Sequence, residues 1–269
     1  MKKLFLFCLL ATLIVGCYTH YRYTRLAESK HYDNLELGIP GPSDLVIDRE
    51  GYALGYSTMY SQPLWVTYRL TDFEVTNKVC KRFGFFLEDP TVKEHFYVGA
   101  FSEDYFRTGY DRGHMAPAAD MHWSTNAMLE SFYMANISPQ TPELNRHTWR
   151  FAESFARNCA VKEGSVFIVT GPICTNDNPK TIGIGNVVVP DAFYKVIYDE
   201  TPPEKMMAFV MPNAAPSLDM WLYATNVVYV EEITGYKFFP NVATNLQQEL
   251  KYKFDEKDWK VYDEENTAP

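Results

Sequence analysis

The sequence predicts a mixed α+β domain in which a central, mostly antiparallel sheet is flanked by helices. Short runs of β-branched and aromatic residues recur between Gly- and Pro-containing turns in both halves of the chain, as strands of such a sheet would. Two longer segments, residues 145–159 and 217–234, are predicted to be helices. With 269 residues, 46% of them apolar and 16% aromatic, the chain can bury a large core as one big domain or two small ones.

The first residues are predicted to be a targeting segment and not part of the fold. Two lysines precede the apolar run 4–15, which is too short for a comfortable membrane span. The run ends in L-I-V-G-C, which resembles a bacterial lipobox, where cleavage precedes a cysteine that is then lipidated. We therefore expect a lipoprotein-type signal peptide over residues 1–16, a tether over 17–34 and a membrane anchor at Cys17. The protein would lie in the bacterial cell envelope or be secreted, and ordinary signal cleavage beside an incidental cysteine is the alternative.

The bulk charge argues against a protein that coats nucleic acid through a basic surface. A net charge of -9 and a pI of about 5.2 leave too little clustered Lys and Arg for that role. A local basic cleft is compatible with this total, and residues 78–82 and 107–112 could supply it. Five cysteines without a C-x-x-C pair argue against a disulfide scaffold and a zinc ribbon. Cys159 and Cys174 either pair or are small buried residues.

The first half of the chain is predicted to form the sheet. The expected strands are residues 44–49, 51–56 and 64–70. Trp65 and Tyr68 in the last run are expected to pack within the fold and not to form a stacking platform for bases. Arg82, taken alone, is expected to extend along apolar neighbours or to pair with Glu88 or Asp89.

Four polar or small residues follow one another in Asp111-Arg112-Gly113-His114, where no capping rule requires them. Gly113 permits a close backbone approach just before the histidine. His114 is suited to accept a proton from water near neutral pH, and Asp111 and Arg112 could set its surroundings or contact a phosphate. A lone histidine is more often structural, so this tetrad alone is only moderately specific.

A second polar stretch, residues 136–145, leads into the first predicted helix, with a proline in the first turn. Asn145, Trp149 and Glu153 are spaced i, i+4, i+8 and are expected on one face of it. An amide oxygen and a carboxylate in this arrangement are plausible partners for a hard cation that keeps several waters, as Mg²⁺ does. The alternative is that Asn145 lines a polar helix face and Glu153 is solvated.

The second half is predicted to complete the sheet and add a helix. The expected strands are residues 165–170, 186–189, 193–198 and 207–211. In the helix over 217–234, Ser217 is the expected N-cap, with Asp219 in the first turn. From Tyr236 onward the aromatic and acidic chain is expected to be peripheral and partly frayed, with an acidic C-terminal tail over residues 243–269.

Four separated motifs carry a resemblance to a known family. They are D-R-G-H at 111–114, N-I-x-P-Q at 136–140, L-N-x-x-x-W at 144–149 with Glu153 following, and an upstream R-x-x-x-F-x-x-D-P at 82–90. Together they resemble the DNA/RNA non-specific endonucleases, also called His-Me or ββα-metal finger nucleases. The resemblance covers residues 35–242 and implies a ββα-metal finger on one face of the sheet.

The resemblance implies a metal-dependent hydrolysis of phosphodiester bonds in DNA and RNA. Carried over by position, His114 is the general base and Asn145 the one direct protein ligand of Mg²⁺, for which Mn²⁺ is the alternative. Glu153 would orient a water on the metal, and Arg82 would stabilise charge on the phosphorus centre. These roles meet the needs of the reaction, which are a nucleophile, charge neutralisation and a stabilised leaving group.

Three further residues match the family motifs. Asn136 is expected to support the geometry of the site, while Asp111 and Arg112 are expected to hold neighbouring groups or to position substrate. The partners implied are DNA and RNA as substrates, a membrane through lipidated Cys17, and a homodimer that the sequence leaves open.

Competing functions have weaker support. The spacing of His114, His122 and His147 does not match a zinc hydrolase, and the chain has no nucleophile elbow or phosphate-binding P-loop. The main alternative is an envelope-anchored binding or adhesion protein on a catalytically degenerate nuclease fold. The intact set of Arg82, His114, Asn145 and Glu153 argues against it.

Overall fold

The computed structural model describes residues 32–96 and 99–263. The predicted signal peptide over 1–16, the lipidation site Cys17 and nearly all of the predicted tether lie outside the described residues. Across the described ranges, no helix has the length and apolar character that crossing a membrane requires.

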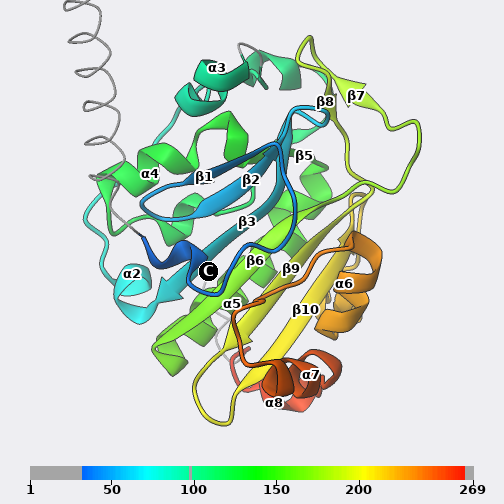
Figure 1. Ribbon diagram of the computed structural model, residues 1–269. Coiled ribbons are helices and arrows are strands. Elements are labelled where there is room, and N and C mark those ends of the chain that lie inside the picture. The colour runs from blue at the N-terminus through cyan, green and yellow to red at the C-terminus, as the bar shows by residue number, and fades with distance from the viewer. Residues whose placement is uncertain (1–31, 97–98, 264–269) are drawn as a thin grey trace, which may run out of the picture. The chain divides into compact units, whose positions relative to one another are not determined.

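A seven-stranded sheet forms the centre of the domain, with the order β1-β2-β3-β6-β9-β10-β11 (Figure 1). Each neighbouring pair runs antiparallel, which confirms the predicted α+β class with a mostly antiparallel sheet. The strands are β1 (Leu45–Asp48), β2 (Ala53–Ser57), β3 (Gln62–Thr71), β6 (Ser165–Ile173), β9 (Ala192–Asp199), β10 (Lys205–Pro212) and β11 (Ala224–Thr225).

Two smaller pairs of strands lie outside the central sheet. The prediction over 186–189 corresponds to β8 (Val187–Val188), which pairs with β7 (Thr181–Ile182) as a separate antiparallel ribbon. The other pair, β4 (Asp111–His114) with β5 (Ile137–Gln140), contains the predicted D-R-G-H and N-I-x-P-Q motifs.

Side chains of β3 alternate between two cores on opposite faces of the sheet. Tyr68 belongs to one core and Trp65 to the other, and both are almost fully buried. Their polar atoms are paired as well, because Trp65 Nε1 donates to the Gly41 carbonyl at 3.0 Å and Tyr68 Oη to Asp120 Oδ2 at 2.9 Å. The expectation that these aromatics pack within the fold is confirmed.

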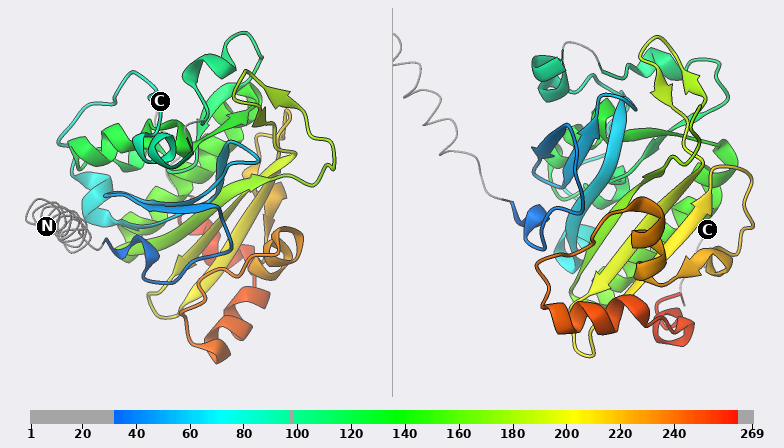
Figure 2. Two further views of the ribbon diagram at one scale, coloured as in Figure 1. Left: turned by 45° about the horizontal axis from the view of Figure 1, so that its top comes forward. Right: turned by 45° about the vertical axis from the view of Figure 1, so that its right-hand side comes forward.

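Helices cover both faces of the sheet. On one face, α5 (Trp149–Glu163) buries Trp149, Phe155 and Cys159 in the first core. On the other, α6 (Val227–Thr234) and α7 (Thr244–Tyr252) pack against the second core (Figure 2, right, orange to red in front of the strands). The remaining α-helices are α2 (Asp72–Thr76), α3 (Pro90–Phe96), α4 (Thr125–Ser131) and α8 (Glu256–Lys260), and the short 3-10 helices are η1 (Asp33–Leu35), η2 (Ser102–Tyr105), η3 (Ala118–Asp120), η4 (Met134–Asn136) and η6 (Met220–Tyr223).

The cysteines in the described part of the chain are free thiols, so Cys159 and Cys174 do not pair. Cys159 is a small buried residue of α5, which was the other expectation. Burial raises the pKa of the Cys174 thiol to about 12.

The predicted helix over 217–234 is wrong in its first half. Asp219, and not Ser217, caps a short 3-10 helix by accepting from Trp221 N. The chain then extends as β11 to pair with β10, and α6 begins only after Asn226, whose side chain caps it. Pairing at the sheet edge is a tertiary contact that overrides the apolar pattern of the segment.

The expectation that the chain from Tyr236 onward is peripheral is wrong for the residues up to Asp263. Trp259 is 1% exposed and packs against Phe155 of α5, with ring centroids 6.3 Å apart. Leu250 of α7 is buried in the second core, and Lys251 Nζ lies 2.8 Å from Glu231 Oε1 of α6. The sequence did not predict this packing, because the buried apolar residues are widely spaced among acidic ones.

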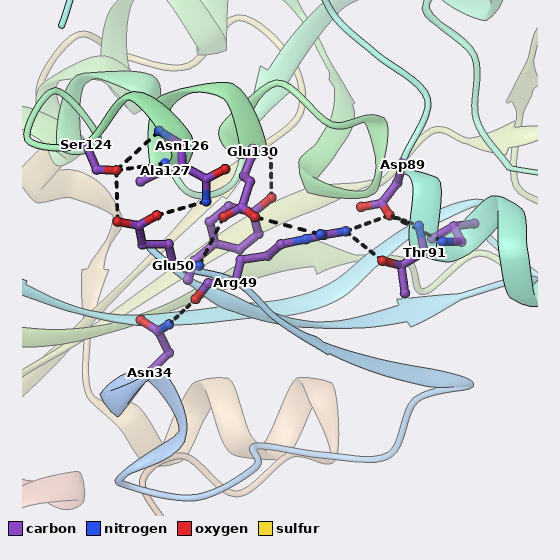
Figure 3. A network of polar contacts seen from close by, with 11 residues as sticks. Asn34, Arg49, Glu50, Asp89, Thr91, Ser124, Asn126, Ala127 and Glu130 are labelled. Carbon is purple, nitrogen blue, oxygen red and sulfur yellow. Dashed lines mark hydrogen bonds and ion pairs between the residues drawn. The ribbon is translucent and has the colours of Figure 1, made fainter. Parts of the chain in front are cut away.

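A polar network ties the turn between β1 and β2 to the start of α3 and to α4 (Figure 3). Arg49 Nη2 lies 2.7 Å from Asp89 Oδ1 and 3.0 Å from Thr91 Oγ1, and Arg49 Nη1 lies 3.8 Å from Glu130 Oε1. Asp89 also accepts from the first backbone N–H groups of α3, including that of Thr91. This carboxylate is therefore committed to Arg49 and not to Arg82.

Candidate active site

The two-stranded pair β4–β5 and the helix after it build one end of a cleft. His114, the last residue of β4, lies opposite Ile137 of β5. After β5 the chain enters a π-helical turn, η5 (Leu144–Thr148), and continues directly into α5. Two antiparallel strands followed by a helix give the ββα arrangement that the sequence resemblance implied.

The cleft has a volume of about 290 Å³ and contains five of the seven predicted site residues. It is lined by Arg82, Arg112, His114, Pro117, Ala118, Ala119, Asn145, Arg146, Arg150 and Glu153. Four of these are arginines, which gives a local basic cleft in a chain of net charge -9. Arg82 and Arg112 come from the two basic runs named above, whereas Arg146 and Arg150 were missed. Their i, i+4 spacing beside Asn145 is the signal that would have found them.

His114 is held between aromatic side chains. Its ring centroid lies 4.9 Å from that of Phe132, edge-on, and 5.3 Å from that of Phe86. The residue is only 7% exposed, and Nε2 is buried without a hydrogen-bond partner in the described structure. Burial, assisted by the charge of Arg82, lowers the pKa of His114 to about 3. The imidazole is therefore neutral at neutral pH, as a group that accepts a proton must be.

Asn145 is held by a charged side chain of β4. Asn145 Nδ2 donates to Asp111 Oδ2 at 3.0 Å, and Arg146 binds both oxygens of the same carboxylate at 2.8 and 2.7 Å. Although burial opposes the shift, the hydrogen bonds from Arg146 and Asn145 lower the pKa of Asp111. Because the amide nitrogen is bound to Asp111, the amide oxygen of Asn145 is left as the free acceptor.

The helix that carries Asn145 and Glu153 is not regular at its start. The N–H of Trp149 bonds to the carbonyl of Leu144, five residues earlier, so the first turn is wider than an α-helical turn. Asn145 and Glu153 still both line the cleft, while Trp149 is 1% exposed in the core beneath. The sequence spacing thus predicted two cleft residues on one face but not the wide turn.

Glu153 is a carboxylate with reduced access to water. Burial raises the pKa of Glu153 to about 7, and the charges of Lys195 and Arg157 oppose that rise. Glu153 is half-buried in the cleft wall, so it is not the fully solvated side chain of the alternative expectation.

Arg82 reaches the cleft without a carboxylate partner. Its guanidinium lies 5.1 Å from the ring centroid of Phe132, and the described residues give it no ion pair. The expected partners are engaged elsewhere, Asp89 by Arg49 and Glu88 by Lys93 at 2.8 Å. The guanidinium is thus available to an anion in the cleft.

Asn136 and Arg112 are fixed by backbone groups. Asn136 is fully buried, and its side chain accepts from Ala116 N at 2.9 Å and donates to the carbonyls of Ala116 and Ser131. It therefore fixes the segment that follows His114. Arg112 donates through Nε and Nη2 to the Ser102 carbonyl, which places its guanidinium at the cleft wall.

The donor set limits the kind of metal that fits. Among residues 32–96 and 99–263, no three or more His, Cys, Asp or Glu side chains gather as a metal site. One amide oxygen and one carboxylate suit a hard cation that keeps most of its waters and do not suit a zinc centre. With a neutral imidazole and a free arginine in the same cleft, the fold and the site define a nuclease of the ββα type.

Comparisons with known proteins agree with this class. A model of the DNA/RNA non-specific endonuclease family matches residues 31–245. Human mitochondrial endonuclease G is 33% identical over 218 residues, which cover 76% of this chain and 72% of the relative. Nuclease C1 of Cunninghamella echinulata is 34% identical over 231 residues, which cover 80% of this chain and 91% of the relative.

The chain belongs to the DNA/RNA non-specific endonuclease family, and it is an endonuclease of DNA and RNA. The mitochondrial nuclease of Saccharomyces cerevisiae is similar as well, at 34% identity over 79% of this chain and 71% of the relative. A crystal structure of an EndoG/EndoGI complex matches with a TM-score of 0.72 and 31% identity, over 78% of this chain and 91% of that chain. Nothing in these comparisons supports the alternative of a binding or adhesion protein on a degenerate fold.

Proposed function

We propose that this endonuclease depends on Mg²⁺, with Mn²⁺ as the alternative ion, and that Asn145 is the one direct protein ligand. The observation that carries the proposal is the bond from Asn145 Nδ2 to Asp111 Oδ2, which leaves the amide oxygen as the acceptor on a residue that lines the cleft. Glu153 lines the same cleft and can accept hydrogen bonds from water around the cation.

In this proposal, different residues of the cleft have different roles in hydrolysis. His114, neutral because of its apolar surroundings, takes the proton of the attacking water. Arg82, free of a carboxylate partner, binds the phosphate oxygens on which negative charge accumulates. Asn136 keeps the segment after His114 in place, and Asp111 keeps Asn145 in place. The divalent cation, when bound, adds positive charge near the scissile phosphate and its leaving oxygen.

Plasmid cleavage in Mg²⁺, with and without EDTA, tests the assignment. We expect His114→Ala to lose at least about 100-fold in rate, because general base catalysis contributes that much or more. His95→Ala, which changes an exposed histidine of α3 outside the cleft, is the matched control and should keep the parental rate. Activity that resists EDTA, or a parental rate in His114→Ala, would refute the proposal.

The variant Asn145→Ala tests the proposed metal ligand separately from the proposed general base. We expect this variant to fold normally and to need far more Mg²⁺ for the same rate, because it lacks the proposed ligand oxygen. A parental Mg²⁺ titration would show that Asn145 is not the ligand. The unfolding transition of the variant, measured in EDTA, checks that the fold is retained.

We also propose that the protein is exported and anchored in the bacterial cell envelope through lipidated Cys17. The support is the sequence of residues 1–17, with its two lysines, apolar run and terminal cysteine. Mass measurement of the mature N-terminus tests it, with Cys17→Ala as the variant that would remain unlipidated. A homodimer stays a prediction that light scattering of the purified domain can check.

A further inference from the structure

Lys195 occupies a position in β9 where an apolar residue is expected. Side chains alternate along this strand, and Phe193 and Ile197, two residues to either side, belong to the core beneath α5. Lys195 is 0% exposed and lies opposite Thr170 of β6 and Phe209 of β10. A lysine is almost never fully buried without a partner, because removing an ammonium group from water is costly.

The ammonium group lies beneath the part of α5 that faces the cleft. Lys195 Nζ is 4.7 Å from the ring centroid of Trp149, a cation–π contact that offsets part of the burial cost. Nζ is buried and has no hydrogen-bond partner in the described structure. Trp149 and Glu153 are one helical turn apart on α5, so the lysine lies near the base of the turn that presents Glu153.

The neighbouring charged groups are already paired with one another. Arg157 Nη1 lies 2.8 Å from Asp120 Oδ1, and Asp120 Oδ2 accepts from Tyr68 Oη at 2.9 Å. Arg157 and Asp120 therefore satisfy each other. Lys195 Nζ is the buried cation here that the described residues leave without a partner, and the half-buried Glu153 is the neighbouring carboxylate that no ion pair of the described residues engages.

The effects of these charges on pKa values link Lys195 to Glu153. Among the charges that act on Glu153, that of Lys195 opposes the burial-induced rise of its pKa most strongly, ahead of those of Arg157 and Arg82. Reciprocally, burial lowers the pKa of Lys195, and Glu153 is the first charge that opposes this shift. Each group is thus the main compensating charge for the other.

We propose that Lys195 is a positioning residue for catalysis, whose buried ammonium group beneath α5 acts by its charge on the Glu153 carboxyl group and keeps that group ionised toward the cleft. The inference rests on the role of Glu153 in the proposed function. A lysine that only filled space in the core would act on the stability of the fold and not through Glu153.

A double-mutant cycle tests the coupling by rate. Lys195→Met keeps the length of the side chain and removes the charge. We expect a loss of about 10- to 100-fold in kcat with little change in KM for DNA, because groups that orient an active-site ligand have effects of that size. In a Glu153→Gln background the same substitution should cost no more than about 2-fold, because its target is already neutral.

Urea unfolding in EDTA provides a readout that does not depend on activity. Lys195→Met in the parent removes the charge that most favours the ionised form of the half-buried Glu153, so the unfolding midpoint at neutral pH should fall. In Glu153→Gln the same change replaces an uncompensated buried cation by an apolar side chain, so the midpoint should stay or rise. Opposite effects in the two backgrounds support electrostatic coupling between Lys195 and Glu153.

Lys251→Met is the matched control, because Lys251 is 4% exposed and paired with Glu231 in a part of the fold away from the cleft. It should lower the unfolding midpoint and leave kcat unchanged. A parental kcat in Lys195→Met, or equal losses in both Glu153 backgrounds, would overturn the inference while leaving the role of Glu153 intact. A parental kcat in Glu153→Gln would instead remove Glu153 from the mechanism, and the inference with it.

Discussion

Phe86 and Phe132 enclose the His114 imidazole, and this apolar contact determines its protonation state. An exposed histidine is half protonated near pH 6.5, whereas burial lowers the pKa of His114 to about 3. The proposed base is thus in its proton-accepting form throughout the neutral range. Acid loss of activity above pH 4 would have to come from another group.

The same shift predicts a pH dependence of stability. Between about pH 6.5 and pH 3 the unfolded chain binds a proton at this histidine and the folded chain does not, so stability falls as pH falls through that window. His114→Phe should show a weaker fall than the parent in urea unfolding at pH 7 and pH 4. NMR titration of the imidazole in the metal-free protein gives the pKa directly, and a value near 6.5 would contradict the prediction.

Asp111 contacts both Asn145 and Arg146, so its removal should free the side chain of Asn145, the proposed metal ligand, without deleting it. We expect Asp111→Ala to lower Mg²⁺ affinity by about 10- to 100-fold, because partners that orient a metal ligand contribute that much. Arg146→Ala removes only the outer partner and should have a smaller effect. An Asp111→Ala protein with a parental Mg²⁺ titration would show that Asn145 is oriented by something else.

Secondary structure followed the sequence wherever short-range patterns determine it. The strands of the central sheet are rich in apolar and aromatic residues, and six of the seven expected strands are present in it, while the one over 186–189 forms β8 in a separate ribbon. The π-helical turn η5 was not predictable, because one wider turn leaves the spacing of Asn145 and Glu153 nearly unchanged. Strand β11 was hidden within an apolar run, because only its pairing with β10 distinguishes it from a helix.

The C-terminal helix α8 is predicted to stabilise the fold mainly through one buried side chain, Trp259. Trp259 of α8 is 1% exposed and contacts Phe155 of α5. Trp259→Ala should lower the free energy of unfolding by about 3–5 kcal/mol, as large-to-small changes in a core do. Tyr252→Ala, which changes an exposed aromatic at the end of α7, should cost much less. Equal urea midpoints for Trp259→Ala and the parent would mean that this helix is not part of the cooperative unit.

Within the whole molecule, the identities of the site residues were predictable and their partnerships were not. His114, Asn145, Glu153, Arg82 and Arg112 were named from local motifs, and one cleft contains them. The pair of Arg49 with Asp89 joins residues 40 apart, and that of Asp111 with Arg146 joins residues 35 apart. Such contacts depend on how the helices and strands pack together. The spacing of residues along the sequence does not show that packing.

The contrast between an acidic chain and a basic cleft predicts how binding responds to salt. Arg150 lines the cleft, and the described residues give it no carboxylate partner. In a His114→Ala background, Arg150→Gln should reduce the slope of log affinity for DNA against log salt by about 1, as the loss of one phosphate contact does. Arg69→Gln, outside the cleft and paired with Glu200 at 3.0 Å, should leave the slope unchanged. Equal slopes for Arg150→Gln and the parent would exclude a phosphate contact.

The free thiols of Cys80, Cys159 and Cys174 mean that non-covalent contacts hold the described part of the cleft together. Within residues 32–96 and 99–263 no covalent cross-link joins α5 to the strands, so the cleft is assembled by burial and hydrogen bonds alone. The fold of this part therefore contains no disulfide that a reducing agent could break.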